Sequence, residues 1–494
     1  MAYARHPQLR EGPAGANHAS GARHGPSSFP RCLGGRISVS RDFAEVPVDH
    51  ADARRAAESV LDFPGADDVE VSVMGSQTGV TRYALSEIIQ NTVRNEVRAY
   101  VRVVTGRQVA TAVTTQLDAG HMNRAAASAL EAARQSRPDE EWPGLPSPDV
   151  VGHAQGCWRY DDATAAATPK ERAAQVVRLL SASEADNTSG VFETSAHSFS
   201  VLSSAGVDCA DAHTRCVTTC LVDTGEATGW GEDSSHRLDR VDAEAAARRA
   251  LDKARRGTGA IDAPTGRHQV VLEPAAVATM LEYLSYCGMG AKQFIDGESF
   301  LIGQTGKQLA APGITLADDV WHAHSVGIGF DFEGVPKKRV AVIDQGTATG
   351  PVTDWRTSRK LKTEPTGHYS GSTEFGPYAS HLVLDRGGDS LDELISGVDD
   401  GLLVTRFHYV NVLDRPSTLL TGMTRDGTFR ITKGEVGGAV HNFRFAHSVL
   451  DALRSTSGVG RELAAFAPDY GSFGGTVAPA LRVEDFNFAS TTSH

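Results

Sequence analysis

Hydrophobic positions in the first half of the chain follow two spacings, a helical one of three to four residues and an extended one of two. Val69, Val71 and Val73 alternate with polar residues and predict a strand, whereas Asp49 and Asp118 precede helical patterns as capping residues. The predicted elements are helices over residues 50–62, 119–136, 169–182 and 243–256, and strands over residues 69–73, 80–92, 97–104, 109–115, 191–202 and 215–222. This order predicts an N-terminal α/β domain over residues 46–260, with a sheet covered by helices on one face.

The pattern changes after residue 268, where short apolar runs are separated by glycine-containing turns. These runs predict strands over residues 269–272, 340–343, 402–405, 428–432 and 439–440, with helices over residues 275–287, 391–398 and 448–454. We expect a C-terminal β-rich domain over residues 261–490, sandwich- or barrel-like, with a few helices. The predicted fold class is α+β.

Residues 1–45 show no periodicity and are dominated by Gly, Pro, Ser, His and Arg. This composition predicts a disordered leader, because such a segment cannot bury enough apolar surface to fold. We interpret His6, His18 and His24 within it as solvated side chains and not as metal ligands.

Charge and composition exclude several classes of partner. The formal net charge is −13, and the longest basic run is Lys337-Lys338-Arg339, so we expect no nucleic-acid partner. No apolar stretch reaches the ~18 residues that span a bilayer, and we expect no membrane association. The six cysteines are few and are not spaced as a disulfide framework, which favours a reduced, cytoplasmic protein.

The sequence contains few motifs that predict catalysis. None of the 18 histidines forms an HxxH, HxxxH or HExxH pair, the spacing by which a helix holds zinc. The tightest pair is His322 and His324, which would share one face of a strand and chelate a metal together. Acidic residues nearby could supply oxygen ligands: Asp318, Asp319, Asp331 and Glu333. The alternative is two surface histidines beside acidic residues.

The cysteines and glycines offer no better motif. Cys216 and Cys220 would share a strand face as small buried side chains, since CxxxC is not the redox spacing. Cys287 ends a predicted helix and would be a nucleophile only with a histidine beside it. The glycine-rich residues 471–475 follow no predicted strand, so we interpret them as a loop.

Short motifs in a fixed order give the chain a resemblance to the TldD/PmbA family, over roughly residues 50–490. In the first half these motifs are Gly65–Val71, Thr81–Ala84, Ile88–Asn91, Val101–Val104, Trp142–Pro148 and Gly229–Gly231. In the second half they are Gly297–Leu301, Gly306–Gln308, Phe330–Pro336, Thr366–His368, Arg425–Phe429 and Gly434–Val436. Each motif is weak alone, whereas their order along the whole chain is specific.

The resemblance implies an N-terminal α/β domain, a C-terminal β-rich domain and a place in a two-component zinc metallopeptidase. In TldD-type chains a helix carries a His-Glu-x-x-x-His segment, and a later Cys completes the zinc site. Here Glu282, Tyr283 and Cys287 occupy the positions of the first His, the Glu and the second His. No cysteine follows Cys287, and a tyrosine cannot replace a carboxylate as a base near pH 7. The chain therefore resembles the TldE (PmbA) type, with zinc expected in a TldD-type partner subunit and none in this chain.

Three functions remain open at this point. The first is a non-catalytic subunit that helps a TldD-type partner hold an extended peptide, including precursors of modified peptides or conjugates in natural-product pathways. The second is an independent hydrolase that uses a metal at His322 and His324 or a nucleophile at Cys287. The third is a homo-oligomeric peptide-binding protein without catalysis.

Overall fold

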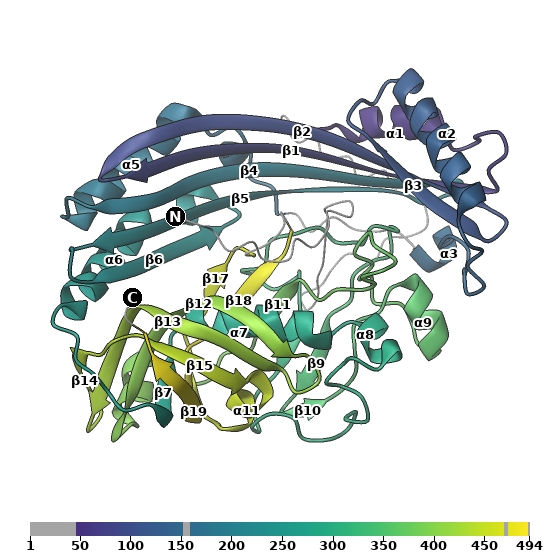
Figure 1. Cartoon of the computed structure of the whole chain (residues 1–494). Coiled ribbons are helices and arrows are strands. Elements are labelled where there is room, and N and C mark those ends of the chain that lie inside the picture. Colours follow the sequence, from purple (N-terminus) through teal and green to yellow (C-terminus); the bar gives the residue numbers. More distant parts are fainter. Residues whose placement is uncertain (1–45, 152–158, 469–472, 493–494) are drawn as a thin grey trace, which may run out of the picture.

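A computed structural model of the chain describes residues 46–151, 159–468 and 473–492 (Figure 1). The predicted leader over residues 1–45 lies outside the described residues, as do Cys32 and Cys157. The described part is a mixed structure of helices and strands, which confirms the predicted α+β class.

The first half builds one long antiparallel sheet. Its strands are β1 (Asp68–Ala84), β2 (Glu87–Thr105), β3 (Gln108–Thr114), β4 (Thr188–Ser203), β5 (Asp208–Asp223) and β6 (Thr228–Ser235). They are ordered β3-β2-β1-β4-β5-β6, so each strand lies beside a neighbour in sequence, apart from the step from β1 to β4. Figure 1 shows this sheet arching over the C-terminal half.

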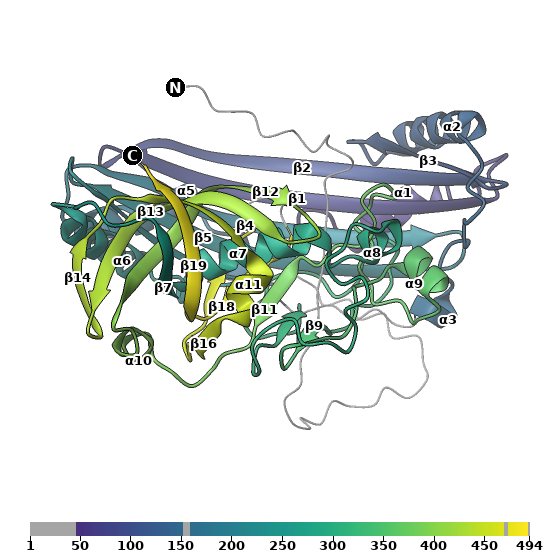
Figure 2. The ribbon, with the colours of Figure 1, turned by 60° about the horizontal axis from the view of Figure 1, so that its bottom comes forward.

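Helices cover one face of this sheet, as predicted (Figures 1 and 2). The longer ones are α1 (His50–Glu58), α2 (Ala119–Gln135), α5 (Pro169–Ser183) and α6 (Ala243–Gly257), and the short ones are α4 (Asp162–Ala165) and the 3₁₀ helix η1 (Leu238–Arg240). The short helix α3 (Pro148–Val151) lies on the opposite face, where Val151 packs with Phe199 and Val201 of β4. Val71 and Val73 of β1 pack with residues of α1 and α2, and Tyr83 on the same face packs with α5 and α6. Asp49, Asp118 and Asp242 cap α1, α2 and α6 through their side chains, because each accepts a backbone N–H of the first turn.

The predicted strand over residues 80–92 is wrong, because a hairpin turn divides it. Leu85 and Ser86 form this turn with φ values of 51° and 57°, a conformation that glycine or asparagine usually supplies. β1 and β2 therefore pair over their full lengths, with a bulge between Arg82 and Tyr83. The strand β6 was not predicted. Its Gly229 and Gly231 let α6 approach closely, since an added Cβ would lie 2.0 and 1.9 Å from the carbonyl oxygens of Ala250 and Ala246.

The second half contains two further sheets. In the first, β12 (Asp400–Asp414), β7 (Gly266–Leu272), β19 (Leu481–Thr491), β15 (Phe443–Ser448) and β13 (Leu419–Thr432) close into a ring through pairing of β12 with β13, with β14 (Glu435–Ala439) and β16 (Thr456–Val459) beside it. The second sheet has the order β10 (Thr347–Ala348), β9 (Val340–Asp344), β8 (Leu316–Asp318), β11 (His381–Leu384), β18 (Gly475–Ala478) and β17 (Ala464–Phe466). The barrel-like expectation for the second half is confirmed.

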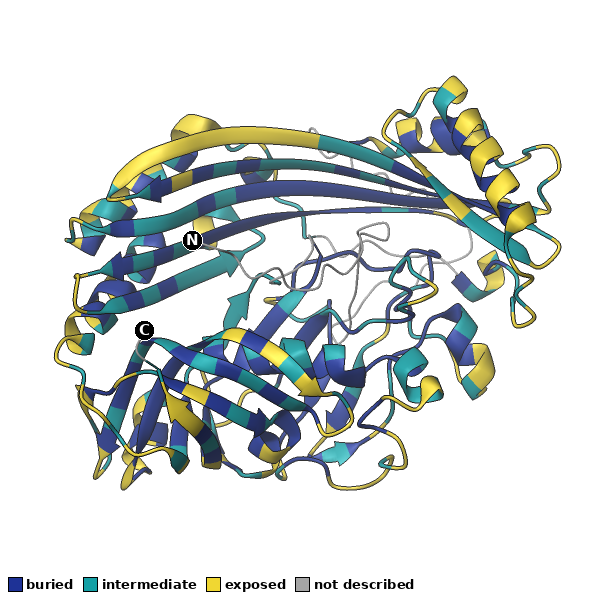
Figure 3. Cartoon of the chain, in the orientation of Figure 1, coloured by how far each residue is buried: buried dark blue, intermediate teal, exposed yellow. Residues whose placement is uncertain are grey.

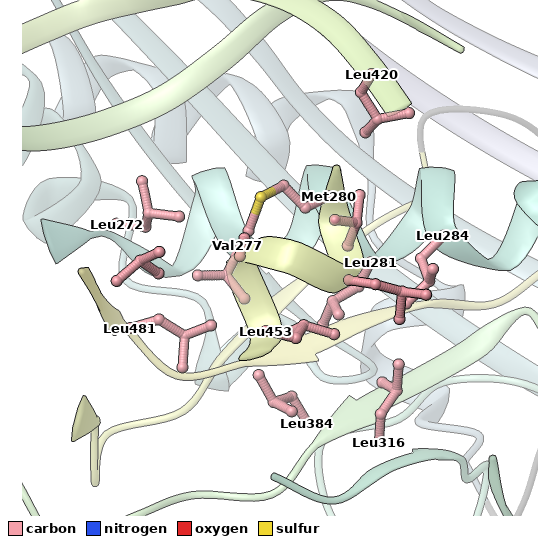
Figure 4. Packing of buried hydrophobic residues seen from close by; sticks show 14 of the residues in the cluster. Leu272, Val277, Met280, Leu281, Leu284, Leu316, Leu384, Leu420, Leu453 and Leu481 are labelled. Atoms are coloured by element: carbon pink, nitrogen blue, oxygen red, sulfur yellow. The ribbon is translucent and has the colours of Figure 1, made fainter. Parts of the chain in front are cut away.

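One helix organises the core of the second half. The helices here are α7 (Pro274–Gly288), α8 (Ala291–Asp296), α9 (Trp355–Leu361), α10 (Leu391–Ser396) and α11 (Val449–Arg454). α7 packs against β12 on one side and against β17 and β18 on the other. Leu281 and Leu284 of α7, Leu453 of α11 and Leu481 of β19 belong to one cluster around it (Figure 4). A helix that is apolar on nearly all sides must be buried in this way.

A shared ion pair joins the long sheet to the C-terminal half. Arg102 on β2 contacts Glu70 on β1 at 2.7 Å and Glu333 of the second half at 2.9 Å, and all three side chains are buried. The Arg102 guanidinium also lies 5.6 Å from the Trp142 ring and 5.1 Å from the Tyr369 ring, within cation–π range. Burial raises the pKa of both carboxyls, while Arg102 acts in the opposite direction.

The outer edge of the sheet stays open along part of β2. Residues 99–105 pair with β3, whereas residues 87–98 pair with no strand of the described chain on that side. Figure 3 shows this stretch of β2 as exposed, and Ile89 and Val93 are among its apolar residues. Arg94, Glu96 and Arg98 carry charge along it, a common means of discouraging edge-to-edge aggregation.

Within the described ranges, no helix has both the length and the apolar character needed to cross a membrane.

We expect Arg102→Met to lower the free energy of unfolding by about 3–5 kcal/mol, because it leaves Glu70 and Glu333 buried without their cation. Urea denaturation followed by fluorescence measures this loss. The matched control is Arg94→Met, which removes an exposed ion pair with Glu96 on the same strand and should cost about 0.5 kcal/mol or less. Equal losses in the two variants would contradict a role for Arg102 at this junction.

Candidate functional site

The helix α7 carries the three positions that the resemblance singles out. Pro274 begins the helix at a position where its missing N–H costs nothing. The helix then runs without interruption to Gly288, so Glu282 and Tyr283 share one turn and Cys287 lies about one turn further along. The structure thus places all three on one rigid element, and each has a different environment.

Tyr283 is tied to the strand beside it. Its hydroxyl donates a hydrogen bond of 2.7 Å to the carbonyl oxygen of Val410 on β12. This carbonyl lies where the β12–β13 register shifts, between His408 and Asn411. The phenol therefore anchors α7 to an irregular part of the strand and does not offer a carboxylate for base chemistry.

Cys287 belongs to the hydrophobic core around α7 and is fully buried. Burial raises the pKa of its thiol to about 12, so the thiol is protonated near neutral pH. A protonated, enclosed thiol is a poor nucleophile. This environment disfavours the alternative of a Cys287 nucleophile.

Glu282 is half-buried and faces an aromatic group instead of a set of metal ligands. Its charge raises the pKa of Tyr378, after the larger effect of burial on that phenol. Next to it on α7, Ser285 donates a 2.5 Å hydrogen bond to the carbonyl of Ala379, and the Tyr286 ring stacks on Phe375 at 6.4 Å. The loop that bears Phe375 and Tyr378 thus covers this side of α7.

A cation completes this cover. The guanidinium of Arg415, from the turn between β12 and β13, lies 4.5 Å from the centre of the Tyr286 ring. It also pairs with Glu298 at 3.1 Å. Cys287 thus lies in the core, Tyr283 is anchored to β12, and Glu282 lies beside the aromatic rings that Arg415 covers. This set of residues does not fit a zinc ion.

His322 and His324 lie in a turn after β8, so no strand aligns them on one face. Their rings are 5.6 Å apart and tilted, and the His322 backbone N–H donates to Asp319. Arg159 donates to the carbonyls of Trp321 and His322 and holds the turn from outside. Burial lowers the pKa of His322 to about 4, with further lowering by His324 and nearby arginines.

Three of the four acidic residues proposed as further ligands are engaged elsewhere. Asp318 lies 3.2 Å from His368 and accepts the His381 backbone N–H, while Glu333 pairs with Arg102. Asp331 accepts three backbone N–H groups, and burial raises its pKa to about 7. Over the ranges that the structure covers, no three His, Cys, Asp or Glu side chains gather as metal ligands would.

Cys216 and Cys220 are structural. Cys216 and Cys220 are buried among apolar residues beneath α5 and α6, which confirms that prediction. Of the predicted glycine-rich loop at residues 471–475, residues 471 and 472 lie outside the described part, and Gly475 begins β18.

The sequence reasoning missed the aromatic cover of α7, since Phe375 and Tyr378 are about 90 residues away from the helix in sequence.

The second half of the chain matches a known domain. Residues 265–490 fit the sequence profile of the PmbA/TldA metallopeptidase C-terminal domain. A metalloprotease of Methanothermobacter thermautotrophicus is 27% identical over 240 residues, which is 48% of this chain and 52% of that protein. The chain thus matches about half the length of this curated relative.

The fold is similar to a solved structure over nearly its whole length. The crystal structure of TldE from Thermococcus kodakarensis superposes with a TM-score of 0.79 and 22% identity. The superposition covers 88% of this chain and 100% of the TldE chain. At this level of identity the similarity establishes the fold.

We expect Tyr283→Phe to lower the free energy of unfolding by about 1 kcal/mol, because it leaves the Val410 carbonyl without its donor. Tyr409→Phe is the control, since Tyr409 is an exposed neighbour on the same strand and should change stability little. Chemical denaturation of both variants measures the difference. A Tyr283 variant as stable as the wild type would show that the bond does not anchor α7.

The lowered pKa of His322 predicts a contribution to acid sensitivity. Its folded-state pKa of about 4 is below the ordinary value near 6.5, so the unfolded chain takes up the proton first. This stabilisation is complete above the unfolded pKa and is lost as the pH falls toward 4. Between pH 7 and pH 5, the wild type should lose up to about 2 kcal/mol more than His322→Gln. His324→Gln, an exposed neighbour, should follow the wild type; an unchanged slope in His322→Gln would contradict the assignment.

Proposed function

Since this chain belongs to the TldD/PmbA family, we propose that it is the non-catalytic, TldE-like subunit of a heteromeric TldD/TldE zinc metallopeptidase. The metallopeptidase-domain match over residues 265–490 and the TldE-like fold support this proposal. The relative that shares sequence with this chain is itself described as a metalloprotease.

The observation that carries the proposal is the environment of two side chains on α7. Cys287, at the position of the second zinc-binding histidine, is enclosed in the core, and Tyr283, at the position of the catalytic glutamate, donates to Val410. A zinc site needs ligands that converge on one open point and a base for the attacking water. Cys287 and Tyr283 contribute to packing, and they supply neither converging zinc ligands nor a base for water.

The partner in this proposal is a TldD-type subunit with an intact His-Glu-x-x-x-His helix, which would hold the zinc and activate the water. This chain would close the shared cavity and help to hold the substrate. An extended peptide suits such a role, because strand addition uses backbone hydrogen bonds and accepts varied side chains. The substrates in the proposal are peptides or peptide conjugates, including precursors in natural-product maturation, and the site of action is the cytoplasm.

Metal content of the purified full-length chain tests the proposal directly. We expect less than about a tenth of an equivalent of zinc by plasma mass spectrometry, because α7 offers no converging ligands. About one equivalent that EDTA removes would contradict the proposal. If His322→Ala also abolished that binding, the independent metallohydrolase would become the better explanation.

Reconstitution with the partner provides the second test. Each chain alone should leave a fluorogenic peptide intact, and the mixture should cleave it, with a complex visible by size-exclusion light scattering. The matched control replaces the zinc-binding histidines of the partner, which should abolish cleavage while the complex still forms. Cleavage by this chain alone, or peptide binding by a homo-oligomer with no response to the partner, would contradict the subunit role.

A further inference from the structure

A cavity of about 450 Å³ opens in the C-terminal half, between the end of β15, the helix α11 and the segment that follows α8. Its volume falls in the range of small-molecule sites. None of Glu282, Tyr283, Cys287, His322 and His324 lines it. The cavity is therefore separate from the positions discussed above.

The lining has two chemical characters. One wall is apolar and is formed by Phe300, Leu309, Leu419 and Leu450, three of which are buried. The lining also carries hydrogen-bonding groups, among them Gln304, His447 and Asn487. An apolar body and a few placed polar groups are the usual features of a site for a small organic ligand.

His447 breaks the pattern of its strand. On β15, Phe443, Phe445 and His447 occupy alternate positions on the face that points to the core. His447 is only 6% exposed, and its ring lies 4.5 Å from the Phe486 ring. A third phenylalanine would suit this environment, so the imidazole is a polar group placed where packing alone does not require one.

The imidazole also has an unused hydrogen-bonding atom. Its Nε2 is buried and has no hydrogen-bond partner, although most buried polar atoms in proteins have one. Burial lowers the pKa of His447 to about 4, with Asp451 and Asp485 acting to raise it and Arg267 to lower it. The ring is thus neutral near pH 7, and Nε2 can carry a hydrogen to donate.

Two arginines line the cavity with a single acidic residue. Arg454 pairs with Asp451 at 2.5 Å, and Arg267 pairs with Asp485, which lies outside the lining. All four side chains are largely exposed, and exposed ion pairs of this kind are weak. A carboxylate in the cavity could therefore draw a guanidinium away from its present partner, and the planar guanidinium matches a carboxylate well.

We propose that this cavity binds a small organic carboxylate with an apolar chain. The chain would lie on the wall of Phe300, Leu309, Leu419 and Leu450, and the carboxylate would accept hydrogen bonds from His447 Nε2 and from a rim arginine. The proposal is independent of the subunit role, since it concerns a different face of the chain and involves no metal or peptide cleavage.

The test uses 4-phenylbutyrate and its neutral analogue 4-phenylbutyramide as probes, with the full-length chain in a titration calorimeter. We expect the acid to bind about tenfold more tightly than the amide, because only the acid engages the arginines as an anion. Equal affinities would overturn the carboxylate assignment. No binding of the acid up to about 10 mM would overturn the site itself.

The variant His447→Phe tests ligand binding while keeping the fold, because phenylalanine continues the series of core-facing aromatic residues on β15. We expect this variant to have a melting temperature at least as high as the wild type and to bind the acid about tenfold more weakly. Arg454→Gln should weaken the acid more than the amide, whereas Arg430→Gln, which removes an exposed pair with Asp400 elsewhere, should leave both unchanged. Wild-type affinity in His447→Phe would overturn the proposal.

Discussion

The burial of α7 is the constraint on which the C-terminal half depends. This helix exposes almost no side chain, so it needs apolar partners on every side. β12 supplies them on one side and β17 and β18 on the other, with α11 completing the cluster. Two sheets that would otherwise be separate are thereby held around one helix, and their loops are fixed relative to each other.

This enclosure also bears on the three α7 positions that the family resemblance singles out. A metal site on α7 would need polar ligands and room for water at the centre of the half, which costs stability unless every polar atom is satisfied. In this chain Cys287 fills core volume and Tyr283 bonds a strand carbonyl. The loop with Phe375 and Tyr378 then packs over one side of the helix. At these two positions, the residues of this chain contribute to packing.

Much of the fold could be predicted from local pattern, and the failures have identifiable causes. Capping aspartates and helical spacing located α1, α2 and α6, because these signals act within a few residues. The turn at Leu85 and Ser86 was missed because neither residue favours a positive φ, so tertiary pairing of β1 with β2 must impose it. The conformation around His322 and His324 could not be predicted for a similar reason, since Arg159, far away in sequence, holds that turn. The degenerate positions on α7 came from family resemblance, and no local pattern could have revealed the aromatic cover.

The shared ion pair at the junction of the sheet and the C-terminal half has an evolutionary consequence. Arg102 serves two acids at once, so a change at any one of Arg102, Glu70 and Glu333 leaves a buried charge with an altered balance. Single substitutions should therefore be selected against, even though an apolar trio of similar volume could pack as well. Among related sequences the three positions should be retained together or replaced together. Such covariation links a residue of the second half to two strands more than 200 positions earlier in the chain.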